Sequence, residues 1–349
     1  MAEINWDRVN RGLEREQHRM IWRPYGVPTV LDLDHSAFHD AAISEPWDVP
    51  EKLVVSVAIT GAFFRSDQNP NQPITPDEIR KSARQCMLEG ASTVHIHVRD
   101  DNGYNTLSQD RFEQVIRPLK EEFSDLFVDG CMVPALDGEW DEMVRILKSG
   151  LLDGAPINTT STYIGDSLFV KPAPMMIEKT RLIVETGAIP EIAVYTDADV
   201  TNADRFLLRS GLVSTPAVWI VLPALPGCSP MNNPRQMVSG LTRIVSSIRD
   251  VDPEGVIMVC AAGRASMHVA TLAAAMGLHI RVGMEDTYYR WPHRDDRVES
   301  NVQALQLAKH LAEAVGRPVA TPAEYGEMMR ACRPTMTANP NLASSQVAG

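Results

Sequence analysis

The sequence predicts an α/β protein that folds as a (β/α)8 barrel, or TIM barrel, with an N-terminal extension. Between residues 52 and 332, apolar segments of strand length alternate with helical patterns eight times. A doubly wound open sheet also alternates strands and helices, but no GxGxxG motif follows the first strand. The closed barrel is therefore the favoured architecture.

The first strand and helix set the pattern for the rest of the chain. The apolar run "KLVVSVAITGA" (52–62) ends in glycine and is typical of a buried parallel strand. In the helical segment that follows, Thr75 is a suitable N-cap, Pro76 takes the first helical position and Gly90 ends the helix. The sequence predicts further strands near residues 92–98, 126–132, 154–159, 190–196, 217–222, 256–261 and 278–284. It predicts further helices near residues 107–122, 140–149, 172–187, 201–211, 234–248, 264–276, 300–315 and 321–332.

We place the barrel at residues 51–333. The segments before and after it lack this alternation of strands and helices. Residues 1–50 contain repeated prolines and space for a short polar helix, and we interpret them as an N-terminal arm. Its tryptophans indicate that the arm packs on a neighbouring subunit or forms a lid over the barrel mouth. We expect residues 334–349 to be a flexible tail.

Charge and composition exclude several classes of partner. A net charge of −12 and a pI near 5.2 argue against a nucleic acid or an anionic membrane surface. No apolar run approaches the ~18–20 residues that a membrane span needs. The five cysteines are scattered and form no CxxC pair, which favours a reducing compartment over a disulfide framework. Because the N-terminus also lacks an apolar signal segment, we expect a cytoplasmic protein with small-molecule partners.

Two histidines lie at the end of the second predicted strand, in "TVHIHVRDDNG" (93–103). Alternate residues of a strand face the same side, so the side chains of His95 and His97 point in the same direction. They lie next to the carboxyl-terminal mouth of the barrel, where TIM-barrel enzymes place their active sites. Barrel interiors are usually filled by Val, Ile and Leu, so two imidazoles there need polar partners. A structural interpretation, with one histidine bonded to backbone and the other partly exposed, is the alternative.

A third metal-ligand candidate lies at the end of the eighth strand, in "HIRVGMEDTYY" (279–289). In a closed barrel the eighth strand neighbours the first and the first neighbours the second, so Glu285 can reach a metal held by His95 and His97. Two imidazoles and one carboxylate with an open fourth position form a catalytic zinc set. The alternative is that Glu285 and Asp286 are an acid pair at the N-terminus of the next helix.

These motifs resemble the β-keto acid cleavage enzymes, the family that includes 3-keto-5-aminohexanoate cleavage enzyme. The similar segments occur in order from residue 52 onward: "AITGA" (58–62), "PITPDEI" (73–79), "EGASTVHIHVRDDNG" (89–103), "HIRVGMEDT" (279–287), "SNVQAL" (300–305) and "GRPVATPAE" (316–324). The combination of H-x-H-x-R-[DE] with R-x-G-x-E-D is specific to few proteins.

The resemblance implies a barrel that binds one zinc, or another divalent transition metal, through His95, His97 and Glu285. It implies conversion of a β-keto acid and acetyl-CoA, as co-substrate, into acetoacetate and a new acyl-CoA. It also implies a homo-oligomer, with a tetramer favoured. Arg281 and Asp286 match the remaining catalytic pair of the family. A metal that binds the keto and carboxylate oxygens would acidify the proton at C2, and Asp286 is suitably placed to accept that proton. For Arg281 the alternative is an ion pair in the barrel interior without a chemical role.

Two departures from the resemblance concern the tail of the substrate. Where the amino-keto-acid enzymes carry glutamates, after "TGA" and in the fifth strand, this chain has Phe63 and Ala193. Without these two carboxylates an ammonium group on the substrate has no charge partner, so an amino-tailed substrate is disfavoured. We favour an uncharged tail over a quaternary ammonium, and loop packing is the alternative role for Phe63.

The remaining candidate contacts follow other strands. Candidates for substrate binding are Thr60 in "AITGA", Phe63, Cys131 in "DGCMVP", and Asn158 and Thr160 in "INTTSTYIG". Candidates for binding CoA phosphates are Arg290, Arg294 and Arg297, for which a solvated charged loop is the alternative. Two other functions stay open at this point. One is a metal-dependent barrel lyase or aldolase that uses no CoA, and the other is a catalytically silent homologue that binds a small acid.

Overall fold

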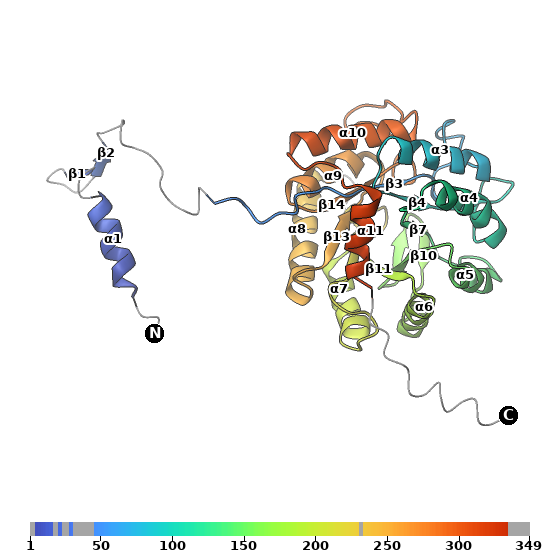
Figure 1. The fold of residues 1–349 in the computed structure, drawn as a ribbon, viewed down its shortest axis with the longest axis horizontal. Helices are drawn as coiled ribbons and strands as arrows, with labels where there is room; N and C mark the ends of the chain where they lie inside the picture. The colour runs from blue at the N-terminus through green and yellow to red at the C-terminus, as the bar shows by residue number, and fades with distance from the viewer. Residues whose placement is uncertain (1–3, 17–19, 23–27, 31–44, 230–232, 334–349) are drawn as a thin grey trace, which may run out of the picture. The chain divides into compact units, whose positions relative to one another are not determined.

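Eight parallel strands close into a barrel in the computed structural model, which describes residues 4–16, 20–22, 28–30, 45–229 and 233–333. The strands follow one another around the barrel in chain order, and the last pairs with the first (Figure 1). They are β3 (Val55–Ala58), β4 (Thr93–Ile96), β7 (Val128–Gly130), β8 (Gly154–Asn158), β11 (Ile189–Val194), β12 (Val218–Val221), β13 (Val256–Val259) and β14 (His279–Val282). The predicted (β/α)8 barrel is confirmed.

A ring of helices surrounds these strands in Figure 1. They are α3 (Pro76–Leu88), α4 (Gln109–Glu122), α5 (Glu139–Lys148), α6 (Ala173–Glu185), α7 (Asp197–Ala203), α8 (Pro234–Val251), α9 (Ser266–Ala275) and α10 (Asn301–Ala314). The expected N-cap of the first barrel helix, α3, is present. The Thr75 hydroxyl accepts a hydrogen bond from the Glu78 amide, and the Glu78 carboxylate accepts one from the Thr75 amide at 2.9 Å.

Among the boundaries that differ from the sequence prediction, the start of one helix has an identifiable cause. The helix expected at residues 201–211 begins earlier, at Asp197, and continues beyond α7 as a π-helical segment, Asp204–Leu208. The cause is a capping box in which the Asp199 carboxylate accepts from the Thr196 amide at 2.8 Å. Thr196 therefore starts a helix instead of ending the fifth strand.

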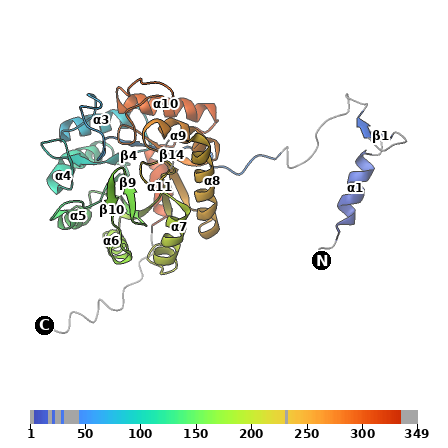
Figure 2. The same ribbon diagram turned by 180° about the vertical axis from the view of Figure 1, so that it is seen from behind.

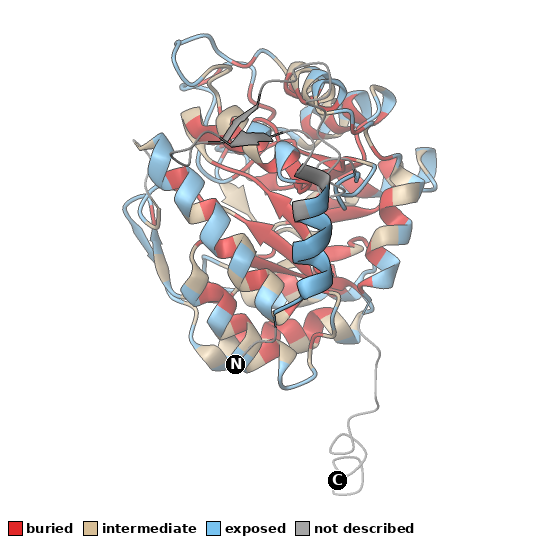
Figure 3. Cartoon of the chain, turned by 90° about the vertical axis from the view of Figure 1, so that its left-hand side faces the viewer, coloured by how far each residue is buried: buried red, intermediate tan, exposed pale blue. Residues whose placement is uncertain are grey.

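A final helix, α11 (Pro322–Ala331), covers the end of the barrel where the strands begin, in front of the strands in Figure 1. Tyr325 is buried there and meets Phe127 edge to face, with ring centroids 5.3 Å apart. The Arg317 guanidinium, just before this helix, donates to the carbonyls of Pro50 and Lys52 and so ties the end of the barrel to its start. In Figure 3 the barrel strands are mostly buried, while the helices show exposed outer faces.

Two short antiparallel ribbons extend from the opposite end of the barrel, on the face seen in Figure 2. The first joins β5 (Val98–Arg99) to β6 (Asn105–Thr106), and the second joins β9 (Thr162–Ile164) to β10 (Ser167–Phe169). Both follow directly after barrel strands, β4 and β8. They place the loop residues beside the carboxyl ends of the strands, where barrel enzymes build their sites.

The structure separates Met1–Val49 from Pro50–Gly349 as a second unit. Its described parts are α1 (Trp6–Glu16) and an antiparallel pair, β1 (Met20–Trp22) and β2 (Pro28–Val30). Trp6 and Trp47 are exposed, and the expected packing of the arm on a subunit or over the mouth stays a prediction. The predicted tail, 334–349, lies outside the described residues. Among the helices that the structure describes, none is long and apolar enough to cross a bilayer.

Candidate active site

The two histidines of the second strand are buried, and each is oriented by a hydrogen bond from its Nδ1 atom. His95 Nδ1 donates to Asp129 Oδ2 at 2.5 Å, and His97 Nδ1 donates to Asn105 Oδ1 at 2.6 Å. The two rings lie 5.3 Å apart between centroids. Because Nδ1 carries the proton in both rings, the two Nε2 atoms are left as free electron-pair donors.

Both Nε2 atoms face the carboxylate of Glu285. His95 Nε2 lies 3.4 Å from Oε2 and His97 Nε2 lies 3.3 Å from Oε1, and the three candidate ligand atoms all fall within 4.8 Å of one another. Tetrahedral ligands at zinc–nitrogen or zinc–oxygen bond lengths stand about 3.3–3.4 Å apart, which matches the two distances between histidine and carboxylate atoms. Glu285 Oε2 is buried and accepts no hydrogen bond from the described residues. The donor set therefore fits one divalent cation.

Glycines let the backbone bring Glu285 to this position. At Gly283, φ is +137° and a Cβ would collide with the backbone of Ala58, so only glycine fits between the strand ends. The chain then turns, and the Glu285 amide donates to the Ala58 carbonyl at 3.2 Å. A Cβ on Gly61 would collide with the side chain of Glu285. The glycines of "TGA" and "RVGMED" thus serve the metal-ligand candidate directly.

Arg281 and Asp286 form a buried, two-point ion pair next to Glu285. Arg281 donates to Asp286 Oδ1 at 2.5 Å and, through Nε, to Oδ2 at 3.2 Å, and it also reaches Glu285 Oε1 at 3.1 Å. Burial raises the pKa of Asp286 to about 6, although Arg281 opposes this shift. A carboxylate of this basicity is suited to accept a proton near neutral pH.

The sequence analysis missed the residues that hold the histidines in place. Asp129 lies on β7 in register with His95, so an inward-facing acid on the strand next to the histidine pair was the available signal. Asn105 lies on β6, directly after the turn that follows the histidines. Behind Asp129 lies Glu191, which is fully buried in the barrel and whose pKa is raised well above its ordinary value by burial and by Asp129.

The predicted substrate contacts fall into two groups. The Thr60 hydroxyl is buried and already accepts from Gln72 Nε2 at 2.9 Å and from Arg99 Nε at 3.0 Å, so it belongs to an internal network. Phe63 is half exposed, in the loop after β3. No hydrogen bond or ion pair in the described chain joins these two side chains to the metal-ligand cluster.

The other three candidates lie nearer the histidines or at the end of β8. The Cys131 thiol lies beside His97, which lowers the thiol pKa to about 7 although burial opposes this. Asn158 donates to the Tyr195 hydroxyl at 2.7 Å, and its Oδ1 is buried and accepts no hydrogen bond from the described residues. Thr160 is half-buried just beyond β8.

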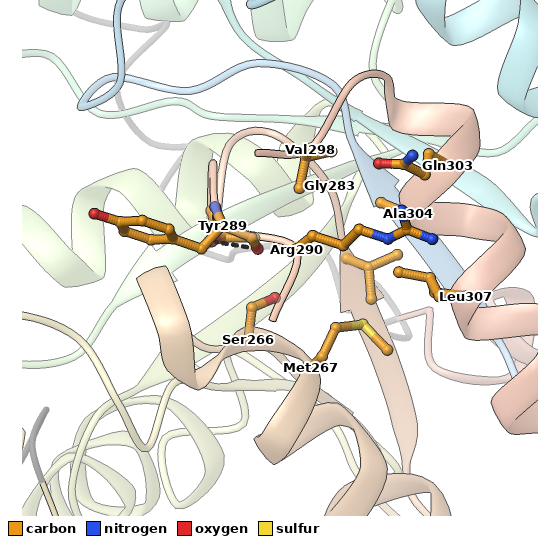
Figure 4. Close-up of a pocket in the computed structure, with 11 residues that line it drawn as sticks. Ser266, Met267, Gly283, Tyr289, Arg290, Val298, Gln303, Ala304 and Leu307 are labelled. Atoms are coloured by element: carbon orange, nitrogen blue, oxygen red, sulfur yellow. Dashed lines mark hydrogen bonds between the residues drawn. The ribbon is translucent and has the colours of Figure 1, made fainter. Parts of the chain in front are cut away.

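The three arginines after β14 already make contacts within the loop and its neighbours. Arg294 pairs with Asp296 at 3.3 Å, and Arg297 donates to the Gln68 carbonyl at 2.6 Å. Arg290 extends toward Gln303 and Leu307 of α10 in a pocket that α9 also lines (Figure 4). Contact of these arginines with CoA phosphates stays a prediction.

Comparison with known proteins matches residues 52–330 to the family model of the beta-keto acid cleavage enzymes. The chain is 33% identical over 284 residues to a 3-keto-5-aminohexanoate cleavage enzyme of Acetoanaerobium sticklandii, covering 80% of this chain and 98% of that relative. It is 25% identical over 279 residues to a 3-oxoadipate:acetyl-CoA acetyltransferase of Cupriavidus necator, covering 78% of this chain and 93% of the relative. The apo structure of ObcA shares the barrel fold, with a TM-score of 0.63 and 17% identity over 75% of this chain and 66% of that one.

The matched region contains the whole barrel and every residue of the His95–His97–Glu285 cluster with its Arg281–Asp286 pair. The chain belongs to the family of β-keto acid cleavage enzymes.

Proposed function

We propose that this enzyme condenses a β-keto acid with acetyl-CoA to give acetoacetate and a new acyl-CoA, and that it depends on a divalent metal, with zinc favoured. The observation that carries the proposal is the spacing of His95, His97 and Glu285, with the basic carboxylate of Asp286 beside them. The name of the Cupriavidus relative, an acetyl-CoA acetyltransferase, supports acetyl-CoA as co-substrate.

His95, His97 and Glu285 would hold the metal. Hydrogen bonds to Asp129 and Asn105 fix the tautomers of His95 and His97, respectively. When bound, such a cation supplies Lewis-acid polarisation of the keto and carboxylate oxygens of the substrate and so acidifies the proton at C2. Two imidazoles and one carboxylate leave a coordination position free for a ligand, as catalytic zinc sites do.

Asp286 accepts the C2 proton, and Arg281 positions Asp286 for this step. The two hydrogen bonds from Arg281 hold both carboxylate oxygens, and the guanidinium stays available to neutralise negative charge that develops nearby. The C2 carbanion forms a bond to the acetyl carbonyl carbon, and the bond between that carbon and the CoA sulfur breaks. The sulfur then bonds to the former keto carbon, the bond between C2 and C3 breaks, and the proton held by Asp286 returns to C2. The products are acetoacetate, which retains C1 and C2 of the β-keto acid, and the acyl-CoA of its remainder.

The tail of the substrate carries no amino group in this proposal. Phe63 is half exposed in the loop after β3, and Ala193 is buried in β11, so neither position supplies a carboxylate for an ammonium ion. An unpaired ammonium would lose its hydration without a charge partner, which is unfavourable.

A substrate screen with metal analysis tests the proposal. Purified enzyme is supplied with acetyl-CoA and β-keto acids of equal length with amino, neutral and acidic tails, and acetoacetate is measured. We expect acetoacetate from non-amino substrates at a higher kcat/KM than from amino-tailed ones, and one metal per chain that is lost in Glu285→Ala. CoA-independent cleavage would instead indicate a lyase, and unchanged metal content and turnover in Glu285→Ala would contradict the metal site.

A further inference from the structure

A buried lysine lies on the barrel-facing side of α6. Lys179 is only 6% exposed, among buried apolar neighbours of the same helix. Helical side chains point back toward the helix N-terminus, and helices of a (β/α)8 barrel begin at the mouth, so the ammonium is directed toward the mouth. It lines a pocket there with Lys171 and Asn158. Apolar walls complete the pocket: Pro134, Trp140, Ile157, Met175 and Met176.

Neither lysine has an acidic partner among the described residues. Three other lysines of the barrel, Lys52, Lys120 and Lys309, pair with carboxylates, but no carboxylate in the described chain forms an ion pair with Lys171 or Lys179. Burial, and then the nearby charge of Lys171, lower the pKa of Lys179 to about 7. Two neighbouring ammonium groups at a desolvated site are unfavourable by themselves, and an anion bound between them would relieve that cost.

The pocket lies at the same end of the barrel as the candidate metal centre, because Asn158 ends β8 and the histidines end β4, with β7 between these two strands. Asn158 is in register with Ala193 of β11, which supplies no carboxylate to neutralise the lysines. Cys131 directly follows β7, and its amide donates to the Ile96 carbonyl of β4 at 3.1 Å. The Asn158 Oδ1 atom, which is buried and accepts no hydrogen bond in the described chain, also belongs to the pocket lining.

We propose that Lys171 and Lys179 form an anion-binding subsite that receives the distal carboxylate of the substrate, which makes the substrate class a β-keto dicarboxylic acid. The subsite rests on the proposed function, since the metal centre holds the other end of the same molecule. This subsite revises the expectation of a substrate with a neutral tail. The sequence showed that two carboxylates are absent, but it did not single out the two lysines. A CoA phosphate has the same anion chemistry, yet the long pantetheine arm separates the phosphates from the reacting thioester, whereas this pocket lies at the end of β8, two strands along the barrel from the histidines of β4.

The test compares two substrates that differ only in the distal carboxylate. Metal-loaded, full-length enzyme is assayed at saturating acetyl-CoA with 3-oxohexanedioate and with 3-oxohexanoate. Lys179→Met removes the charge at nearly constant length, Lys171→Met does the same at a half-buried position, and Lys148→Met changes an exposed lysine at the far end of α5. We expect Lys179→Met to lower kcat/KM for the diacid roughly 10- to 100-fold and to change that for the neutral acid less than about threefold.

Lys171→Met should act in the same direction, so the test stands even if Lys179→Met fails to fold, and Lys148→Met should change neither substrate. A diacid preference that survives both substitutions would overturn the subsite, while acetoacetate formation would still support the proposed function. A KM for acetyl-CoA that rises equally with both substrates would assign the lysines to a CoA phosphate. Borohydride trapping of the keto acid on Lys179 would assign a covalent role, and either result overturns the subsite.

A binding measurement separates failure of the subsite from failure of the function. Glutarate and butyrate, which cannot react, are titrated into the metal-loaded enzyme and into Lys179→Met by calorimetry. Glutarate should bind more tightly than butyrate to the wild type only. If this holds while no β-keto acid yields acetoacetate, the proposed function is wrong and the anion subsite stands. Equal binding of the two acids to the wild type would overturn the subsite.

Discussion

Asp129 Oδ2 accepts a hydrogen bond of 2.5 Å from Nδ1 of His95, across the pair of strands β4 and β7. This contact fixes the tautomer that presents Nε2 to the metal position and increases the basicity of the imidazole. We expect Asp129→Asn to weaken metal binding about 10- to 100-fold, as loss of such outer partners usually does. Competition with a chromophoric chelator measures the change. An affinity equal to that of the wild type would show that Asp129 has no influence on the metal.

Asp286 is predicted to move the C2 proton and not to bind the metal. Asp286→Asn should therefore keep the metal content and lower kcat by roughly 10²- to 10⁴-fold, the usual contribution of a general base. Exchange of the C2 protons into D2O, followed by NMR without acetyl-CoA, should slow in parallel. Asp295→Asn, in the exposed loop after β14, is the matched control and should behave as the wild type. Normal exchange in Asp286→Asn would assign the base to another residue.

Gly61 is predicted to be required by Glu285 and by nothing else nearby. A Cβ at Gly61 would collide with the Glu285 side chain, whereas one at Gly240, in α8, meets no atom within 4 Å. Gly61→Ala should displace the carboxylate and weaken metal binding at least about tenfold. Gly240→Ala should leave metal binding intact and stabilise the protein by up to about 1 kcal/mol. Equal metal affinities in the two variants would contradict the close approach.

His279 should make the fold sensitive to acid. Its ring is buried, its Nδ1 accepts from the Val54 amide at 3.1 Å, and burial, with Arg317 and Arg249, lowers its pKa to about 4. Between pH 6.5 and 4 the unfolded chain binds a proton that the folded chain does not, so stability is complete above this range and falls through it. The loss amounts to about 3 kcal/mol for this group.

Urea unfolding at several pH values measures this effect. His279→Asn keeps an acceptor and should reduce the decline in the free energy of unfolding between pH 6.5 and 4. His310→Asn, an exposed histidine on α10, should leave the decline unchanged. Identical pH profiles for wild type and His279→Asn would refute the argument.

The architecture and the metal-ligand candidates could be predicted because both depend on periodic patterns. Buried parallel strands are nearly continuous apolar runs, and the alternation of His95 and His97 places them on one face whatever surrounds them. The proximity of Glu285 to the two histidines could be inferred from closure of the barrel, because closure leaves only β3 between β14 and β4. These inferences need only the order of the strands.

The residues that could not be predicted depend on contacts between distant segments. Asp129 lies in a strand that the sequence predicts, but its partnership with His95 depends on the register between β4 and β7. Lys179 occupies a position whose burial is set by the packing of α6 on β8 and not by its own polarity. The hydroxyl oxygen of Thr60, whose contact with substrate stays a prediction, accepts from the buried Arg99, a hydrogen bond that joins two strands. Such roles follow from geometry that no pattern in the sequence contains.

The pairing of β3 with β14, and of Leu53 with Val319, has a consequence for synthesis on the ribosome. The first barrel strand emerges early but has no partner on one side until β14, the last strand of the barrel, leaves the exit tunnel. Until then the nascent chain exposes an open strand edge, the feature most prone to association with other chains. Closure of the barrel in the cell therefore waits for its last strand, and slowing elongation would prolong the vulnerable interval.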